Sequence, residues 1–448
     1  MEIFFGFLVS FCLLIFSVLK GIFIGYALIA CWLLFALISI KKGYTIKEIG
    51  EMSYNGGRQS FAVVRILLLI GAVIGVWMAS GTIAAIVYYC LKFITPSLFI
   101  FSSFIICCGV SFLLGTSLGS VSIVGIPLMI IARSGNINLN IVAGTIIAGV
   151  YFGDRCSPLS GSAALVASLT KTDIFTNIKN MIYSSIAPFS LSLVFYYILS
   201  ISQLLKDMNN NLSYELLGTF KIQFIILLPA IIIFLLSLCK FKIYFSASIS
   251  VFIASVIAVL FQNHQFKEVI NSMIFGFQTS ENSPLHNILR GGGIISMLKP
   301  SLVMLVSCSL SGIFKGIKVF DNFKNIVMSK QLTRHKLFSI TSIVSIITAA
   351  FGCNQTISSV MTNEIMKDCY EDIDKYQFAL DLENSGILIA ALIPWNIAAL
   401  VPTTTLNVST IGYIPYAFYL YILPIVYFIH DISEHSTFFK VEMDSNKL

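Results

Sequence analysis

The feature that most constrains this chain is its series of long apolar runs. Seven of them approach or exceed the roughly 20 residues that cross a bilayer core as an α-helix, at 3–19, 21–40, 61–91, 97–114, 222–239, 243–261 and 411–429. Less uniform stretches raise the expected number of crossings to about 11–13. A transmembrane β-barrel would instead show alternating segments of about 10 residues. We therefore expect an all-α polytopic membrane protein.

The composition agrees with a chain whose partner is the lipid bilayer. Of its 448 residues, 57% are hydrophobic and only 11% are charged, against about 25% charged residues in a typical soluble domain. The N-terminus lacks a basic region before its apolar run, since residue 2 is Glu, and no cleavage site follows. We interpret this segment as the first membrane helix.

The net charge of +7 does not predict nucleic-acid binding, because the basic residues gather in loops between the apolar runs. One such loop holds Lys41, Lys42, Lys47 and Arg58, and another is the segment 315–336. Loops of this kind are expected on the cytoplasmic side. The sequence contains no phosphate-binding G-x-x-x-x-G-K-[ST] loop, no C-x-x-C pair and no paired His/Glu set within the spans. We therefore expect no enzyme, no metal site and no cofactor.

A weak internal repeat, at a shift of about 236–237 residues, divides the chain. It superposes the least hydrophobic places within apolar runs, aligning 67–81 with 304–318, 115–129 with 352–366 and 151–165 with 388–402. The charge bias of aligned loops changes sign, as expected when two halves cross the membrane in opposite senses. We predict N-terminal helices (1–50), a first repeat (51–205), connecting helices (206–262), a second repeat (263–431) and a C-terminal tail (432–448).

Inverted halves with interrupted hydrophobic segments are typical of secondary transporters. A broken helix exposes unpaired backbone groups at membrane depth, and these are tolerated only where they line a cavity or bind a solute. The matched interruptions around Pro158 and Pro394 therefore predict the binding site. Gly153 belongs to the first of these breaks.

Asp154 and Arg155 are the only charges between Arg133 and Lys171. An ionisable residue within a membrane span is a functional candidate by default, because placing it there is costly. The alternative is an Asp154–Arg155 pair that serves structure at a helix end.

Polar side chains at the breaks are the other candidate ligands for a cation or a polar substrate. Hydroxyl and amide groups are supplied by Ser157, Ser160, Thr116 and Ser117 in the first half and by Asn354, Gln355 and Asn396 in the second. Close helix packing through small residues is an alternative role for the segment 115–120, and interhelical hydrogen bonding is one for the amides. Asp381 and Glu383 lie near the start of a span and belong either to the site or to a loop.

Several of these motifs together resemble the NhaC-type sodium/proton antiporter family, within the wider ion-transporter superfamily. The resemblance covers about residues 50–430 and rests on W-M-A-S-G-T at 77–82, G-T-S-L-G-S at 115–120, Y-F-G-D-R-C-S-P-L-S at 151–160, L-E-N-S-G at 382–386 and I-P-W-N at 393–396. It implies cation-coupled antiport in a bacterial plasma membrane, with Na⁺ and H⁺ as coupling ions. Some related members exchange organic acids or carry amino acids.

The chain departs from the family pattern at three places where an acidic residue is expected. Gly161 follows S-P-L-S, and Asn354 and Asn384 stand where the family favours Asp nearby. These departures leave Asp154 and Glu383 as the leading titratable candidates.

Three hypotheses follow. The first is Na⁺/H⁺-type antiport by alternating access, in which H⁺ and Na⁺ compete for Asp154. The second keeps this fold but carries a small amino acid or organic acid coupled to H⁺ or Na⁺, because neutral amides suit such a cargo. The third, a membrane enzyme or scaffold without transport, lacks a supporting catalytic constellation. A homodimer is left open as a further partner.

Overall fold

The computed structural model of this chain describes residues 2–203, 211–239, 241–279, 285–286, 288–319 and 333–430. The predicted tail 432–448 lies outside the described residues. So do the first residues of the connecting segment 206–262 and the middle of the basic loop 315–336.

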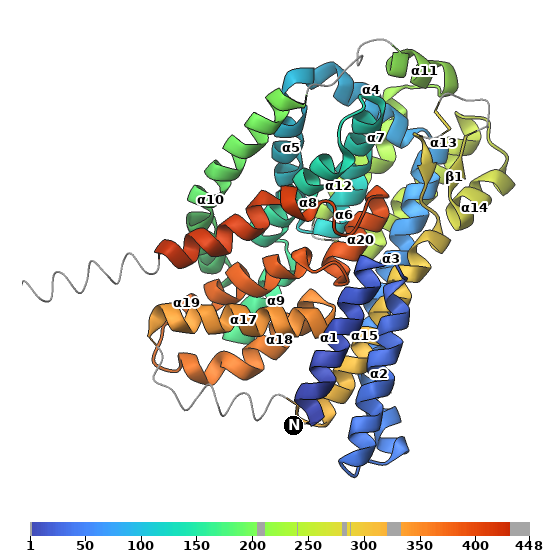
Figure 1. Cartoon of the computed structure of the whole chain (residues 1–448). Helices are drawn as coiled ribbons and strands as arrows, with labels where there is room; N and C mark the ends of the chain where they lie inside the picture. Colours follow the sequence, from blue (N-terminus) through green and yellow to red (C-terminus); the bar gives the residue numbers. More distant parts are fainter. Residues whose placement is uncertain are drawn as a thin grey trace, which may run out of the picture.

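The described chain is built almost entirely of helices (Figure 1). Up to residue 202 the α-helices are α1 (Glu2–Leu19), α2 (Ile24–Lys41), α3 (Ile46–Ala79), α4 (Thr82–Phe93), α5 (Phe99–Leu114), α6 (Ser117–Ser120), α7 (Ile126–Ser134), α8 (Leu139–Cys156), α9 (Gly161–Thr170) and α10 (Ile174–Ser202). Short 3₁₀ or π segments join them at η1 (Pro96–Leu98) and η2 (Val121–Gly125).

After residue 210 the α-helices are α11 (Asn211–Thr219), α12 (Leu228–Leu238), α13 (Ile243–Leu260), α14 (Phe266–Phe275), α15 (Leu298–Gly316), α17 (Arg334–Gly352), α18 (Gln355–Met366), α19 (Lys375–Leu382) and α20 (Ile397–Leu406). The short helical segments are η3 (Phe224–Leu227), η4 (Ile294–Met297), η5 (Lys367–Tyr370), η6 (Glu383–Ile387, a π-helix), η7 (Ala390–Leu392) and η8 (Ile414–Tyr416). A further apolar helix spans Phe418–His430. Strands β1 (Phe277–Gln278) and β2 (Arg290–Gly291) pair antiparallel, with Phe277 opposite Gly291.

Eight helices in the described part of the chain are long and apolar enough to cross a membrane, and two bent pairs raise the number to ten. The bent pairs are Leu212–Thr219 with Phe224–Leu238, at 93°, and Lys375–Leu392 with Ile397–Leu406, at 47°. The predicted 11–13 crossings are reached only if some of the shorter apolar helices, such as Gly161–Thr170, also cross.

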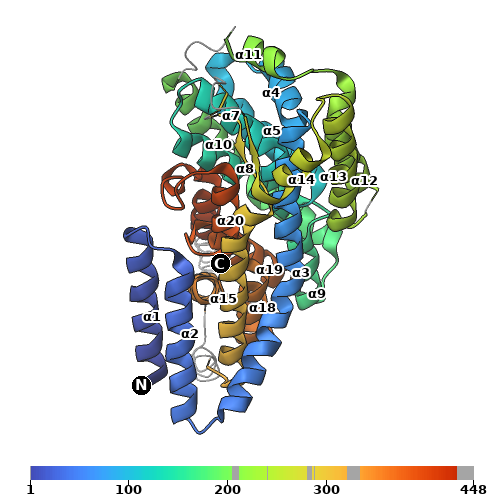
Figure 2. The ribbon, with the colours of Figure 1, turned by 90° about the vertical axis from the view of Figure 1, so that its right-hand side faces the viewer.

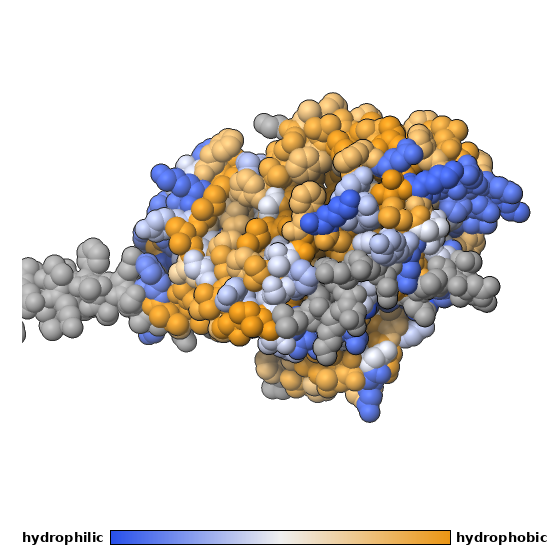
Figure 3. Space-filling model, turned by 90° about the horizontal axis from the view of Figure 1, so that it is seen from above, coloured by the Kyte–Doolittle hydropathy of each residue, from blue (hydrophilic) through white to orange (hydrophobic). Residues whose placement is uncertain are grey.

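Large apolar side chains are exposed on many of these helices, and in Figure 3 they cover much of the face, with hydrophilic residues in separate patches. The all-α polytopic prediction is confirmed.

The internal repeat is visible in the backbone. Six residues with left-handed backbone form three pairs 236–238 positions apart, at Gly81 (φ 76°) and Lys318 (51°), Gly115 (65°) and Cys353 (48°), and Lys171 (55°) and Asn407 (53°). Each pair ends or interrupts equivalent helices, such as α9 at Lys171 and α20 at Asn407. Equivalent breaks therefore have equivalent backbones despite low sequence identity.

The equivalent helices α3 and α15 pack side by side and run antiparallel (Figure 2). Gly56 of α3 lies against Gly312 of α15, and Gly75 lies against Gly293 just before α15. A shift of 237 places Gly293 on Gly56 and Gly312 on Gly75, so the two contacts are copies of each other. A Cβ atom at Gly56 would overlap the backbone of α15, and this close approach requires glycine. The halves are therefore inverted, as the loop charges predicted.

Candidate functional site

The first-half break lies between α8 and α9. α8 ends at Cys156, Ser157 adopts an extended conformation (φ −87°, ψ 136°), and Ser160 caps the N-terminus of α9 by accepting a hydrogen bond from the Ala163 amide at 3.2 Å. The Ser157 hydroxyl accepts from the Leu159 amide at 3.1 Å. Pro158 cannot donate a backbone hydrogen bond, and it sits in this turn as the sequence predicted.

Asp154 lies one turn before the break and is 7% exposed. The Ser160 hydroxyl donates to its Oδ1 at 3.0 Å, and Ser162 Oγ lies 2.8 Å from Ser160 Oγ. Ser117, which follows the second interruption of the first half, adjoins the same carboxylate. Thr116 caps α6 by accepting from the Gly119 amide. The first half thus places one carboxylate among several hydroxyl groups.

In the second half the equivalent residues are amides that bind backbone groups. Asn396 caps α20 by accepting from the Ala398 amide at 2.9 Å, and its Nδ2 donates to the Ala349 carbonyl at 2.8 Å. Asn354 caps α18 by accepting from the Thr356 amide at 2.7 Å, which matches the role of Thr116.

Gln355 Nε2 donates to the Ile387 carbonyl at 2.6 Å. The Ile397 amide donates to the Cys353 carbonyl at 2.9 Å and so joins the two second-half breaks to each other. The amides named here hold the second-half breaks together, and their hydrogen-bond partners among the described residues all lie within that half. A role for them in binding an ion stays a prediction.

Arg155 joins the two halves. It is fully buried and forms no ion pair with Asp154 among the described residues. Its guanidinium instead donates to Asn384 Oδ1 on η6, to Ser184 and Ser185 Oγ, to the Met181 carbonyl and to the Tyr419 hydroxyl. The partners on α10 and on the helix Phe418–His430 were not predicted, because Ser and Tyr within apolar spans carry no distinctive sequence signal.

Glu383 lies beside this cluster on η6 and is 1% exposed. Neither of its carboxyl oxygens has a hydrogen-bond partner among the described residues, nor has Asn384 Nδ2 or Arg155 Nε. Asp154 and Arg155 both lie within electrostatic range of it. The fold thus brings the two carboxylates singled out from the sequence close together.

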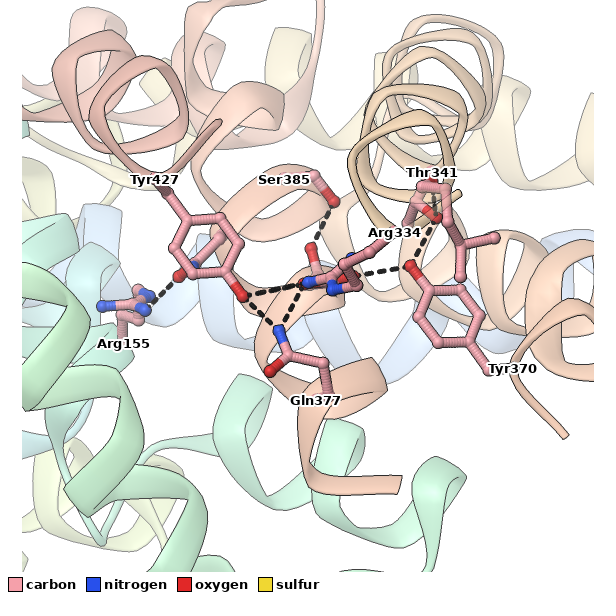
Figure 4. A network of polar contacts seen from close by, with 10 residues as sticks. Arg155, Arg334, Thr341, Tyr370, Gln377, Ser385 and Tyr427 are labelled. Carbon is pink, nitrogen blue, oxygen red and sulfur yellow. Dashed lines mark hydrogen bonds and ion pairs between the residues drawn. The ribbon is translucent and has the colours of Figure 1, made fainter. Parts of the chain in front are cut away.

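A second polar network surrounds Asp381, which is fully buried one turn before Asn384. Figure 4 shows Arg334, Tyr370, Gln377 and Tyr427 of this network close together. Arg334 Nη2 lies 2.6 Å from Asp381 Oδ1, and the Tyr370 hydroxyl donates to Oδ2 at 2.6 Å. Tyr427 and Gln377 donate to Oδ1 at 3.0 and 3.2 Å. The sequence interpretation counted Arg334 with a basic loop, whereas the structure pairs it with Asp381. η6 therefore lies between two arginine-centred networks.

Two cavities flank the antiparallel pair of α3 and α15. The first, here called the α18 cavity, has a volume of about 350 Å³ and includes Asn55, Gln59, Ser311 and Lys315 in its lining. The second, the α7 cavity, has a volume of about 400 Å³ and includes Gly292, Ser296, Ile74 and Met78. The shift of 237 relates the four residues named for one cavity one to one to the four named for the other. The cavities therefore lie at equivalent places at opposite ends of the helix pair.

Inverted repeats, helix breaks that enclose a buried carboxylate, and paired cavities define a secondary transporter. The model of the Na⁺/H⁺ antiporter family matches residues 149–430 of this chain. The chain belongs to this family and is a cation-coupled antiporter of the Na⁺/H⁺ type.

Three relatives illustrate the range of this similarity. The malate-2H⁺/Na⁺-lactate antiporter of Bacillus subtilis is 30% identical over 408 residues, which cover 90% of this chain and 87% of the relative. The Na⁺/H⁺ antiporter NhaC of Alkalihalophilus pseudofirmus is 26% identical over 89% of this chain and 87% of its own length. The arginine/ornithine antiporter ArcD of Halobacterium salinarum is 25% identical over 86% and 81%.

Proposed function

We propose that the protein exchanges Na⁺ for H⁺ across a bacterial plasma membrane by alternating access, with Asp154 as the exchanged-ion site. The observation that carries this proposal is the position of the buried carboxylate at a helix break, bonded to Ser160 and adjoined by Ser117. Carboxylate and hydroxyl oxygens are ligands that suit a hard cation. Because one carboxylate cannot hold both ions at once, binding of Na⁺ releases H⁺.

Glu383 is the second titratable group of the proposed mechanism. A buried carboxylate without a hydrogen-bond partner is costly, whereas its neutral form is much less so. The proposed mechanism therefore assigns the second proton to Glu383, which lies next to Asp154 and Arg155. The neighbouring Asn384 accepts a hydrogen bond from Arg155 and so connects η6 to the first half. In this mechanism a change in the charge of Asp154 or Glu383 therefore acts on both halves.

The α7 and α18 cavities supply the two routes that alternating access needs. Each is lined by α3, by α15 or the segment that precedes it, and by a helix that follows a break, α7 in one case and α18 in the other. Because the cavities lie at opposite ends of an antiparallel helix pair, rocking one repeat against the other opens one cavity as it closes the other.

The test is a reconstituted vesicle in which an imposed Na⁺ gradient drives a change of internal pH. We expect Asp154→Asn to lower the rate at least about 100-fold, as for loss of an essential ion ligand worth roughly 3 kcal/mol. Asp173→Asn is the matched control, because Asp173 is an exposed cap of α10. Absence of any Na⁺ or Li⁺ response in the unmodified protein, or a normal rate for Asp154→Asn, contradicts the proposal.

A second candidate function is H⁺- or Na⁺-coupled transport or exchange of a small amino acid or organic acid. Gly161, Asn354 and Asn384 stand where the family pattern favours acidic residues, so this chain has fewer carboxylates for binding cations than that pattern implies. The relatives named for malate and lactate and for arginine and ornithine make this cargo class reasonable to test. The test is uptake of labelled amino acids and organic acids into vesicles. Absence of uptake for every compound tested counts against this second function.

A further inference from the structure

Two arginines from different repeats face the α7 cavity. Arg133 comes from the last turn of α7, and Arg290 comes from β2. Their charges lie within electrostatic range of each other. No acidic residue is among the described residues that line this cavity. The cavity therefore concentrates positive charge from two segments that are distant in sequence.

Helix capping accounts for only part of this arrangement. Arg133 Nη2 donates to the Leu406 carbonyl at the end of α20, at 2.6 Å, and a basic group is favourable at a helix C-terminus. This contact uses one N–H group of Arg133 and leaves the others available. It gives no role to Arg290, whose side chain has no hydrogen bond or ion pair within the described ranges.

The α18 cavity provides an internal comparison. Its Lys315 pairs with Glu364 at 3.5 Å, so that opposite charges share the same lining. The α7 cavity instead has two like charges in its lining, from Arg133 and Arg290, at positions that the repeat does not place on Lys315 and Glu364. Two cations that face one partly enclosed space repel each other, and an anion bound between them removes this repulsion. The difference thus indicates anion binding at one end of the helix pair.

We propose that the α7 cavity binds a small carboxylate anion between Arg133 and Arg290, as the entry site of a co-transported organic acid. Guanidinium groups bind carboxylates through paired N–H groups, and Thr404, Thr405 and Ser296 add hydroxyl donors to the same lining. A volume of about 400 Å³ lies within the range of small-molecule sites. This proposal rests on the proposed transport function and narrows its second candidate to acids.

The experiment measures uptake of labelled malate and labelled lactate into vesicles that contain the full chain, under an imposed Na⁺ gradient. Arg290→Gln should raise the KM for the transported acid roughly tenfold, as expected for loss of an attracting charge, with little change in maximal rate. Arg290→Lys should keep most of the affinity because it keeps the charge. Added salt should raise the KM of the unmodified protein more than that of Arg290→Gln.

Lys267→Gln is the matched control, because it removes an exposed basic residue from α14 that does not line the cavity. An unchanged KM for Arg290→Gln overturns the inference. So does the absence of carboxylate uptake, or competition by chloride equal to that by carboxylates, while Na⁺-driven pH change continues. If the unmodified protein shows neither acid uptake nor Na⁺-driven pH change, the proposed function fails as well.

Discussion

At the first-half break Ser160 caps α9 and also donates to the buried Asp154 carboxylate, whereas at the second-half break Asn396 caps α20 and donates to a backbone carbonyl. The two caps occupy equivalent places in backbones of the same shape. Their second partners differ, one being an ionisable side chain and the other a fixed backbone group. Both repeats therefore have the break, and only the first repeat carries a carboxylate at its break.

The buried acidic residues of the second half lie before its break, on α19 and η6. Asp381 is held by Arg334, Tyr370, Tyr427 and Gln377. Position 144, which the repeat places on Asp381, is Gly144. The second half thus has a strongly bonded anchor where the first half has none. We interpret the first-half break as the place of the exchanged ion and Asp381 of the second half as a structural anchor.

The largest effect expected from this comparison is loss of stability when the anchor is broken. Arg334→Gln leaves the buried Asp381 carboxylate without its cation and should cost about 3–5 kcal/mol. The double variant Arg334→Gln with Asp381→Asn should cost less, because no uncompensated charge remains. Thermal unfolding in detergent measures both. Equal losses in the single and double variants would contradict an anchoring ion pair.

A smaller effect should follow from placing an acid at the second-half break. Asn396→Asp replaces the amide that donates to the Ala349 carbonyl with an oxygen that repels it, at a cost of roughly 2 kcal/mol. Asn396→Ser imitates the first-half cap and should cost less, since serine is also a good N-cap. Comparison of the two unfolding temperatures tests whether this break tolerates a carboxylate. If Asn396→Asp is the more stable of the two, the contrast between the breaks is wrong.

Gly161→Glu adds a carboxylate to the first-half break and so tests whether charge at this break sets the apparent Na⁺ affinity. No heavy atom lies within 4 Å of a Cβ placed at Gly161, so the side chain fits without loss of packing. The added charge near Asp154 should raise the apparent Na⁺ affinity roughly threefold, the size of a partly exposed charge interaction. Gly161→Gln provides the neutral control of similar size. Equal Na⁺ dependence of the two variants would show that the position lies outside the ion path.

The smallest effect concerns the starts of the paired helices α3 and α15. Thr45 and Glu48 form a capping box at α3, and α15 has no side-chain cap. Hydrogen bonds from the Thr45 amide and hydroxyl lower the pKa of Glu48 below its ordinary value of 4.5. The stabilisation is therefore complete above about pH 4.5 and is lost as the pH falls through the lowered value. Glu48→Gln should be slightly less stable than the unmodified protein at neutral pH and equal to it in acid, as unfolding at both pH values will show.

The sequence predicted the parts of the candidate site whose backbone geometry depends on local chemistry. Pro158 and Pro394 cannot sustain a helical ladder, and the structure has breaks at both. Asp154 stood out because a charge in an apolar run is rare. The partners of Arg155 could not be predicted, since Ser185 and Tyr419 come together with it only through packing of α10 and the helix Phe418–His430. Arg334 was likewise indistinguishable from its basic neighbours until the fold paired it with Asp381.

The reciprocal glycine contacts of α3 and α15 have a consequence for how such a molecule can arise. Gly56 meets Gly312 and Gly75 meets Gly293, so each half presents the same two surfaces to the other. A surface of this kind is self-complementary, which is the property that lets identical subunits associate about a two-fold axis. A polypeptide of half the length that inserted in both orientations would have the contacts to pair with itself. Fusion of two copies then requires only a connecting segment that fixes their opposite orientations.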